Sequence, residues 1–162
     1  MTVPVLYKYS PSPEIPRWPT RRRGPTKPVG VWLSVGDAWE RWCRSGSVFL
    51  DGVRWRRPVI LDPSARVLVL DNRSREFNRF SSRYAIPPGL MLPFPDWEQV
   101  AADWDVLILD PWERLFSEGY RWDWSWDCPS GVALRPGAIA YGPAEQRISP
   151  SGAEAPAAAL GE

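Results

Sequence analysis

The sequence predicts a mixed α+β domain of about six short strands and three short helices. Short runs of β-branched and aromatic residues are bounded by Gly, Pro, Asn and Asp, which is typical of strands that end in turns. Three other segments carry apolar residues three and four positions apart, as amphipathic helices do. Strands and helices do not alternate regularly enough to predict a doubly wound parallel sheet.

The predicted strands are short and rich in Val, Leu, Ile and Trp. They cover residues 3–9, 29–34, 53–61, 66–70, 105–109 and 131–134. Pro58 indicates that the third strand lies at a sheet edge or is broken, because proline cannot donate a ladder hydrogen bond. Gly30 indicates that the second strand has a bulge or is approached closely by a ligand or another backbone.

Each predicted helix follows a side chain that can cap its first turn. The helices cover residues 37–44, 74–84 and 97–103. Ser34 and Asp37 offer capping oxygens to the first helix, Asp71 or Asn72 to the second, and Asp96 to the third.

The length of 162 residues suggests a single domain. We expect it to cover residues 1–142, with a disordered tail over residues 143–162, where Ala, Pro, Gly, Ser and Glu predominate. No run of 18 apolar residues is present, so no transmembrane helix is predicted. The N-terminus lacks a basic and then apolar signal pattern, and we therefore expect a cytoplasmic protein.

Charge is divided unevenly along a chain whose net charge is only +1. Residues 1–57 hold eleven Lys or Arg against four acids, whereas residues 58–162 hold nine against fifteen. Arg21, Arg22 and Arg23 lie in a Pro-rich loop and form either a solvated loop tip or a contact for phosphates. The chain has no His, which removes the commonest general base and His-based zinc sites, so no metal site is predicted.

The segment 121–134 is the most distinctive part of the sequence. Its three tryptophans alternate with polar residues, which places the indoles on one face of an extended segment. The tryptophans are Trp122, Trp124 and Trp126. Such a face requires either a core or a flat ligand, and the alternative to a binding site is that the indoles complete a small core.

Polar side chains follow the third indole where the next strand begins. Asp127, Cys128 and Ser130 stand there, and polar groups beside an aromatic wall are typical of a binding site. Cys43 and Cys128 are too few for a disulfide scaffold, and we expect both to be reduced. Cys43 in the first helix is expected to be a small buried hydrophobe.

Four stretches carry a family resemblance in chain order. Residues 6–10 are Leu-Tyr-Lys-Tyr-Ser, and residues 27–34 are Lys-Pro-Val-Gly-Val-Trp-Leu-Ser. Residues 103–109 are Asp-Trp-Asp-Val-Leu-Ile-Leu, and residues 126–139 begin with Trp-Asp-Cys-Pro-Ser-Gly. These stretches resemble the first, second, penultimate and final strands of small ADP-ribosyltransferases. The last one also resembles the ending of small phage and bacterial proteins.

The resemblance implies a fold, a reaction and a set of partners. It implies an antiparallel core split into two sheets, with NAD bound as the substrate in the cleft between them. A nucleophile of a macromolecular acceptor, protein or nucleic acid, would attack the nicotinamide ribose and release nicotinamide. The transition state resembles an oxocarbenium ion, so a carboxylate and an aromatic wall are needed near the leaving ring. Arg21, Arg22 and Arg23 could steer a nucleic-acid acceptor.

The resemblance also implies the residues of the site. Lys8 stands where the family has a His that holds a ribose hydroxyl, and no Glu opens the final strand. Asp127 is therefore the first candidate for the catalytic acid, and Glu113 is the second. The implied NAD-binding residues are Tyr7, Lys8, Ser10, Trp32, Ser34, Trp126 and Ser130.

Other functions remain open on the same residues. A non-catalytic module could bind a nucleotide or nucleic acid through Trp and Arg, because indoles stack on any base. A protein-interaction module, such as a phage-encoded inhibitor, would use exposed tryptophans of the 120–126 arm as a docking surface. A mechanism with Cys128 as nucleophile would need a group other than His to lower the thiol pKa.

Overall fold

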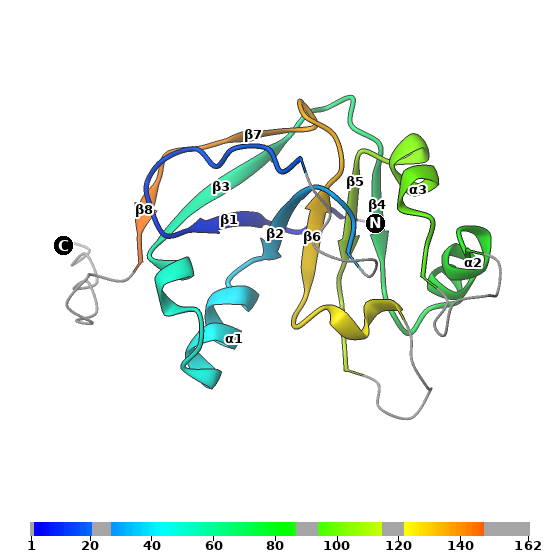
Figure 1. The fold of residues 1–162 in the computed structure, drawn as a ribbon, viewed down its shortest axis with the longest axis horizontal. Helices are drawn as coiled ribbons and strands as arrows, with labels where there is room; N and C mark the ends of the chain where they lie inside the picture. The colour runs from blue at the N-terminus through cyan, green and yellow to red at the C-terminus, as the bar shows by residue number, and fades with distance from the viewer. Residues whose placement is uncertain (1, 21–26, 87–93, 115–121, 148–162) are drawn as a thin grey trace.

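The computed structural model describes residues 2–20, 27–86, 94–114 and 122–147. Within these residues the protein is an α+β fold with one mixed sheet of eight strands and three α-helices (Figure 1). The predicted fold class is therefore confirmed at this level. Arg21, Arg22 and Arg23 lie outside the described residues.

The sheet follows a single path of neighbouring strands. In spatial order they are β4 (Val67–Leu70), β5 (Val106–Leu109), β6 (Ser130–Ala133), β2 (Val31–Val35), β1 (Leu6–Ser10), β3 (Trp55–Leu61) and β7 (Ile139–Tyr141). A short strand, β8 (Glu145–Gln146), also pairs with β3. The β4–β5 pair is parallel, so the prediction of an entirely antiparallel core is wrong there. The chain between β4 and β5 contains α2 and α3. This connection returns the chain to the end of the sheet where β4 began, so that β5 runs parallel to β4.

Along the strand path from β4 to β7, the fewest paired positions lie between β1 and β2. These strands pair at only two positions, Leu6 with Val35 and Tyr7 with Ser34. By contrast, β1 pairs with β3 at five positions and β2 pairs with β6 at four. We call the space beyond the Tyr7–Ser34 pair the β1–β2 fissure. Because hydrogen bonding continues across the two pairs, the strands form one sheet instead of the two that were predicted.

The three helices occupy two regions of the molecule. α2 (Arg75–Arg83) and α3 (Trp97–Asp103) lie beside β4 and β5, whereas α1 (Ala38–Gly46) follows β2 and lies below β1 and β2 in this view (Figure 1). Asp96 caps α3 as predicted, with Oδ1 accepting from two backbone N–H groups. Ser74 caps α2 instead of Asp71 or Asn72, because its Oγ reaches the backbone N–H of Phe77.

The segment predicted as an extended arm folds differently. Residues Trp122–Ser125 form a 3-10 helix, η2, so the prediction of one extended aromatic face is wrong. Trp122 and Trp126 are buried in the core that α2 and α3 cover, at 3% and 1% exposure. Trp122 stacks on Phe77 with ring centroids 5.0 Å apart. The core therefore accounts for these two indoles, and they cannot form an exposed docking surface.

The described chain continues past the predicted domain boundary at residue 142. Residues of β8 pair with β3, and Arg147 hydrogen-bonds through Nε to Glu40 Oε2 at 3.1 Å. The rest of the predicted tail, residues 148–162, lies outside the described residues. None of the described helices is both long enough and apolar enough to cross a bilayer.

Candidate functional site

Two cavities open at the β1–β2 fissure, and Lys8 of β1 and Trp32 of β2 line both of them. The larger has a volume of about 350 Å³, within the range of small-molecule sites. It is lined by Lys8, Tyr9, Pro11, Lys27, Trp32, Leu33, Trp39, Gly52, Trp126, Asp127 and Ser130. Five of the predicted site residues therefore meet here, from three separate parts of the sequence: Lys8, Trp32, Trp126, Asp127 and Ser130.

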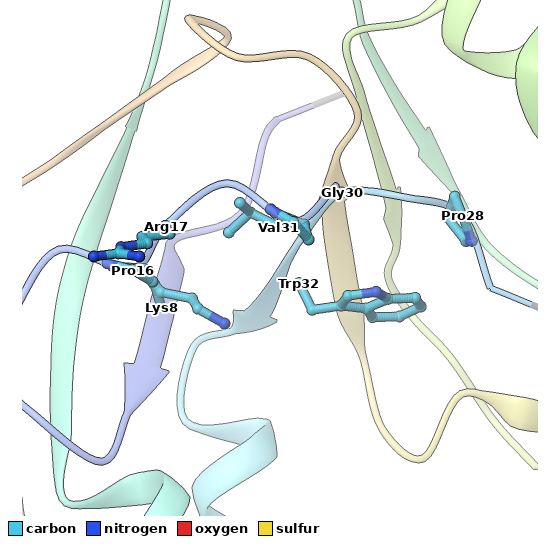
Figure 2. Close-up of a pocket in the computed structure, with 8 residues that line it drawn as sticks. Lys8, Pro16, Arg17, Pro28, Gly30, Val31 and Trp32 are labelled. Atoms are coloured by element: carbon cyan, nitrogen blue, oxygen red, sulfur yellow. The ribbon is translucent and has the colours of Figure 1, made fainter. Parts of the chain in front are cut away.

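The smaller cavity has a volume of about 150 Å³. It lies against the loop that connects β1 to β2, from which Arg17 and three prolines reach it. Figure 2 shows Lys8 extending from β1 toward β2, with the indole of Trp32 on the other side of the view. Two cationic side chains, Lys8 and Arg17, thus line one cavity, which suits an anionic group such as a phosphate.

Gly30 positions the second strand at this cavity. A Cβ atom at residue 30 would lie 2.3 Å from the carbonyl oxygen of Ala133, so only glycine lets β2 approach the end of β6 this closely. The predicted close approach of a second backbone is therefore confirmed. Trp32, two residues later, pairs with Val132 of β6.

Aromatic rings form one wall of the larger cavity. The ring of Trp32 meets the ring of Trp126 edge to face, with centroids 4.7 Å apart. Lys27 Nζ lies 5.1 Å from the centroid of Trp32, in cation–π range. Trp39 from α1 contributes another indole, which sequence reasoning had not placed in the site. A flat ring has apolar faces to contact on this wall.

Polar groups lie at the start of β6. Asp127 lines the cavity, and its Oδ1 is 3.8 Å from Arg114 Nη2, with the carboxylate 31% exposed. Ser130 Oγ donates to the carbonyl oxygen of Cys128 at 2.8 Å. Because the hydroxyl hydrogen is committed and the Cys128 thiol lies 3.4 Å from Ser130 Oγ as a donor, Ser130 offers a ligand one acceptor lone pair.

Four predicted site residues do not line either cavity. Glu113 is 55% exposed, and its Oε1 accepts from Arg73 Nη1 at 2.8 Å, so the second candidate acid points to another partner. Ser34 Oγ donates to Gly36 and accepts from the backbone N–H of Trp39, which is a helix-capping role.

Tyr7 and Ser10 also have partners within the protein. The Arg56 guanidinium lies 4.4 Å from the ring centroid of Tyr7. Ser10 Oγ donates to the carbonyl oxygen of Ser12 at 2.6 Å. Arg56 belongs to β3, which pairs with β1, and Ser12 follows β1 in the chain, and neither residue lines the two cavities.

Glu40 is a buried carboxylate that sequence reasoning missed. It is 4% exposed on α1, accepts from Arg44 and Arg147, and accepts from the hydroxyl of Tyr9 at 3.2 Å. Burial alone would raise the pKa of Glu40, but the bonds from Arg147 and Arg44 outweigh it and lower the pKa. Burial and the charge of Glu40 raise the pKa of Tyr9 to about 12. Because Tyr9 lines the larger cavity, this network fixes its phenol in the neutral form.

The two thiols are poorly suited to nucleophilic chemistry. Cys128 is 5% exposed, and burial raises its pKa. Cys43 is fully buried, as predicted, and burial raises its pKa to about 11. A thiol acts as a nucleophile in its thiolate form, so these shifts oppose the mechanism that would use Cys128.

Comparisons with protein-family models, with curated proteins and with solved structures find no match to this chain. Within the described ranges, no three Cys, Asp or Glu side chains gather in the way that a metal site would need.

Proposed function

We propose that the protein is an ADP-ribosyltransferase-like enzyme that binds NAD in the β1–β2 fissure and transfers ADP-ribose to a macromolecular acceptor. One observation carries the proposal. Lys8, Trp32, Trp126, Asp127 and Ser130, which the family resemblance had singled out, line one cavity although they lie up to 122 positions apart in the chain. The two-pair junction of β1 and β2 supports it too, because the family resemblance implies that NAD binds where the sheet divides.

The roles follow from the chemistry of each side chain. The nicotinamide ring lies against Trp32 and Trp39, and the carboxamide donates to Ser130 Oγ. Lys8 reaches both cavities and, with Arg17, neutralises the pyrophosphate. Lys8 thus has another role than the family's His, which holds a ribose hydroxyl, because an ammonium can donate to a phosphate from several directions.

Asp127 is the proposed catalytic carboxylate. As the bond between the ribose C1′ and the nicotinamide nitrogen breaks, nicotinamide leaves with the electron pair and positive charge develops on the ribose. A carboxylate near this charge lowers the barrier. A lone pair of the acceptor then forms the new bond to C1′, and the acceptor proton passes to solvent.

A second candidate, nucleotide binding without chemistry, has one observation in its favour. The ion pair between Arg114 and Asp127 offsets the negative charge that the reaction needs. In this alternative the cavity still holds a nucleotide between its cations and its indoles, and no nicotinamide is released.

Nicotinamide release from NAD tests the proposal. We compare the wild-type protein with Asp127→Asn, which keeps the size of the side chain, and with Glu113→Gln as a control carboxylate outside the cavity. Loss of about 100-fold or more in Asp127→Asn alone is expected if Asp127 stabilises the transition state. No release, with NAD raising the melting temperature, would favour the binding-only alternative. No release and no stabilisation would refute both.

A further inference from the structure

Three aromatic rings stack beside the larger cavity, and we call Trp39, Trp42 and Phe49 the aromatic platform. The rings of Trp39 and Trp42 are 5.0 Å apart at 17°. The ring of Phe49 lies 6.3 Å and 6.2 Å from them, at 22° and 14°. All three planes are therefore nearly parallel and each ring is adjacent to the other two, so the platform is a cluster of flat faces on which a further flat ring can stack.

Phe49 presents its ring to solvent from an unfavourable backbone conformation. It is 67% exposed, and its φ of 52° lies in the left-handed region that bulky residues avoid. Val48 and Leu50 beside it are 38% and 41% exposed. Core packing does not account for this arrangement, and strained, exposed apolar residues are characteristic of contact sites.

The charge beside the platform favours a polyanion. Lys8 and Lys27 line the adjoining larger cavity together with Asp127, and Arg17 joins Lys8 at the smaller cavity. A polyanion with flat aromatic groups combines both features, and bases of a single strand can leave their own stack to meet such rings. A duplex keeps its bases stacked on one another, so it fits the platform less well.

The platform is continuous with the proposed NAD site. Trp39 belongs to the platform and also lines the larger cavity. Gly52, in the 3-10 helix η1 (Leu50–Val53) that follows Phe49, lines the same cavity. A strand whose base stacks on Phe49 would therefore bring its next nucleotide to the mouth of the cavity.

We infer that the aromatic platform binds the bases of a single-stranded nucleic acid and that this strand is the acceptor of the proposed transfer. The binding part stands on the platform and its charge, whereas the acceptor part rests on the proposed function. DNA and RNA present the same base faces and phosphates to the platform, so the binding experiment compares the two.

Fluorescence anisotropy with fluorescein-labelled oligo(dA) and oligo(rA) of about 12 nucleotides tests the binding. Phe49→Ala is expected to weaken binding about fivefold or more, because one stacked base is lost. Phe49→Tyr keeps the ring and is expected to bind like the wild type. Ile60→Ala is the matched control, since Ile60 is an equally exposed apolar residue, at 59%, on β3.

The outcomes separate this inference from the proposed function. Glu113→Gln, which changes a carboxylate outside both cavities, is expected to bind the oligonucleotides normally, whether or not the wild type releases nicotinamide. Lack of binding by the wild type, or equal binding by Phe49→Ala with an unchanged melting temperature, would overturn the inference. Tighter binding of a duplex than of either single strand would also overturn it. Radiolabel transfer from NAD to the oligonucleotide that binds tighter would establish the acceptor, and binding without transfer would refute the acceptor part alone.

Discussion

Glu40 shows how much one side chain can connect in this molecule. It lies on α1 but accepts from Tyr9 on β1 and from Arg147 after β8, so three distant segments meet at one carboxylate. A buried carboxylate is stable only when it is hydrogen-bonded and paired with cations. The hydrogen bond to Glu40 therefore fixes the position of Tyr9 in the wall of the larger cavity.

Glu40→Gln is expected to lower the free energy of unfolding by about 1–2 kcal/mol at neutral pH, because it removes charge-assisted bonds from two arginines. The lowered pKa of Glu40 gives the sign of the pH dependence. Its stabilisation is fully present above the unfolded-state pKa of about 4.3 and is lost as the pH falls through the lower folded-state value. Urea unfolding of both proteins from pH 7 to pH 3 measures this difference. A gap that widens in acid would contradict the assignment.

Single residues were only partly predictable, and Asp127 and Glu113 illustrate why. Asp127 lies just before the predicted final strand and was the first candidate, whereas Glu113 follows the predicted strand at residues 105–109 and was the second. The structure places Asp127 in the cavity wall, while Glu113 pairs with Arg73, 40 positions earlier. A side chain's partner across such a distance depends on the tertiary fold, whereas the local cap made by Ser34 could be foreseen.

At the scale of elements, the contact between β2 and β6 depends on the absence of a side chain at Gly30. Gly30→Ala is expected to destabilise the protein by about 1–3 kcal/mol, because the new methyl group collides with the backbone of Ala133. Gly52→Ala is the matched control, since a Cβ there meets nothing within 4 Å. Thermal unfolding of the two variants makes the comparison. Equal melting temperatures would argue against the close approach.

Elements with their own local signals were predicted well. Residues 97–103 were expected to be helical from a capping Asp and an apolar face, and α3 has those bounds. The residues around Trp122 were assigned wrongly because alternation of indoles suggested a strand. Trp122 packs on Phe77 and Trp126 packs on Trp32, and the chain between the two indoles forms a 3-10 turn instead of a strand. Those partners lie far away in the chain and leave no trace in the local pattern.

At the scale of the whole molecule, the last described residues connect two parts of the fold. β8 pairs with β3, and Arg147 hydrogen-bonds to Glu40 of α1. A chain that ends at residue 142 loses β8, the Arg56–Glu145 ion pair and the bond from Arg147 to Glu40. It is expected to be about 2–4 kcal/mol less stable than a chain that ends at residue 147, chiefly because the buried carboxylate loses a partner. Denaturant titration of these two chains tests this. Identical midpoints would show that β8 contributes nothing.

The strand order of the sheet also has a consequence for synthesis on the ribosome. β2 leaves the ribosome early, but the strand that covers one of its edges, β6, begins only at residue 130. An uncovered strand edge is a template for pairing with other chains. The nascent protein therefore carries an open β2 edge until the residues from 130 onward have been added. A ribosome that stalls before residue 130 releases a fragment that lacks the strand needed to close this edge.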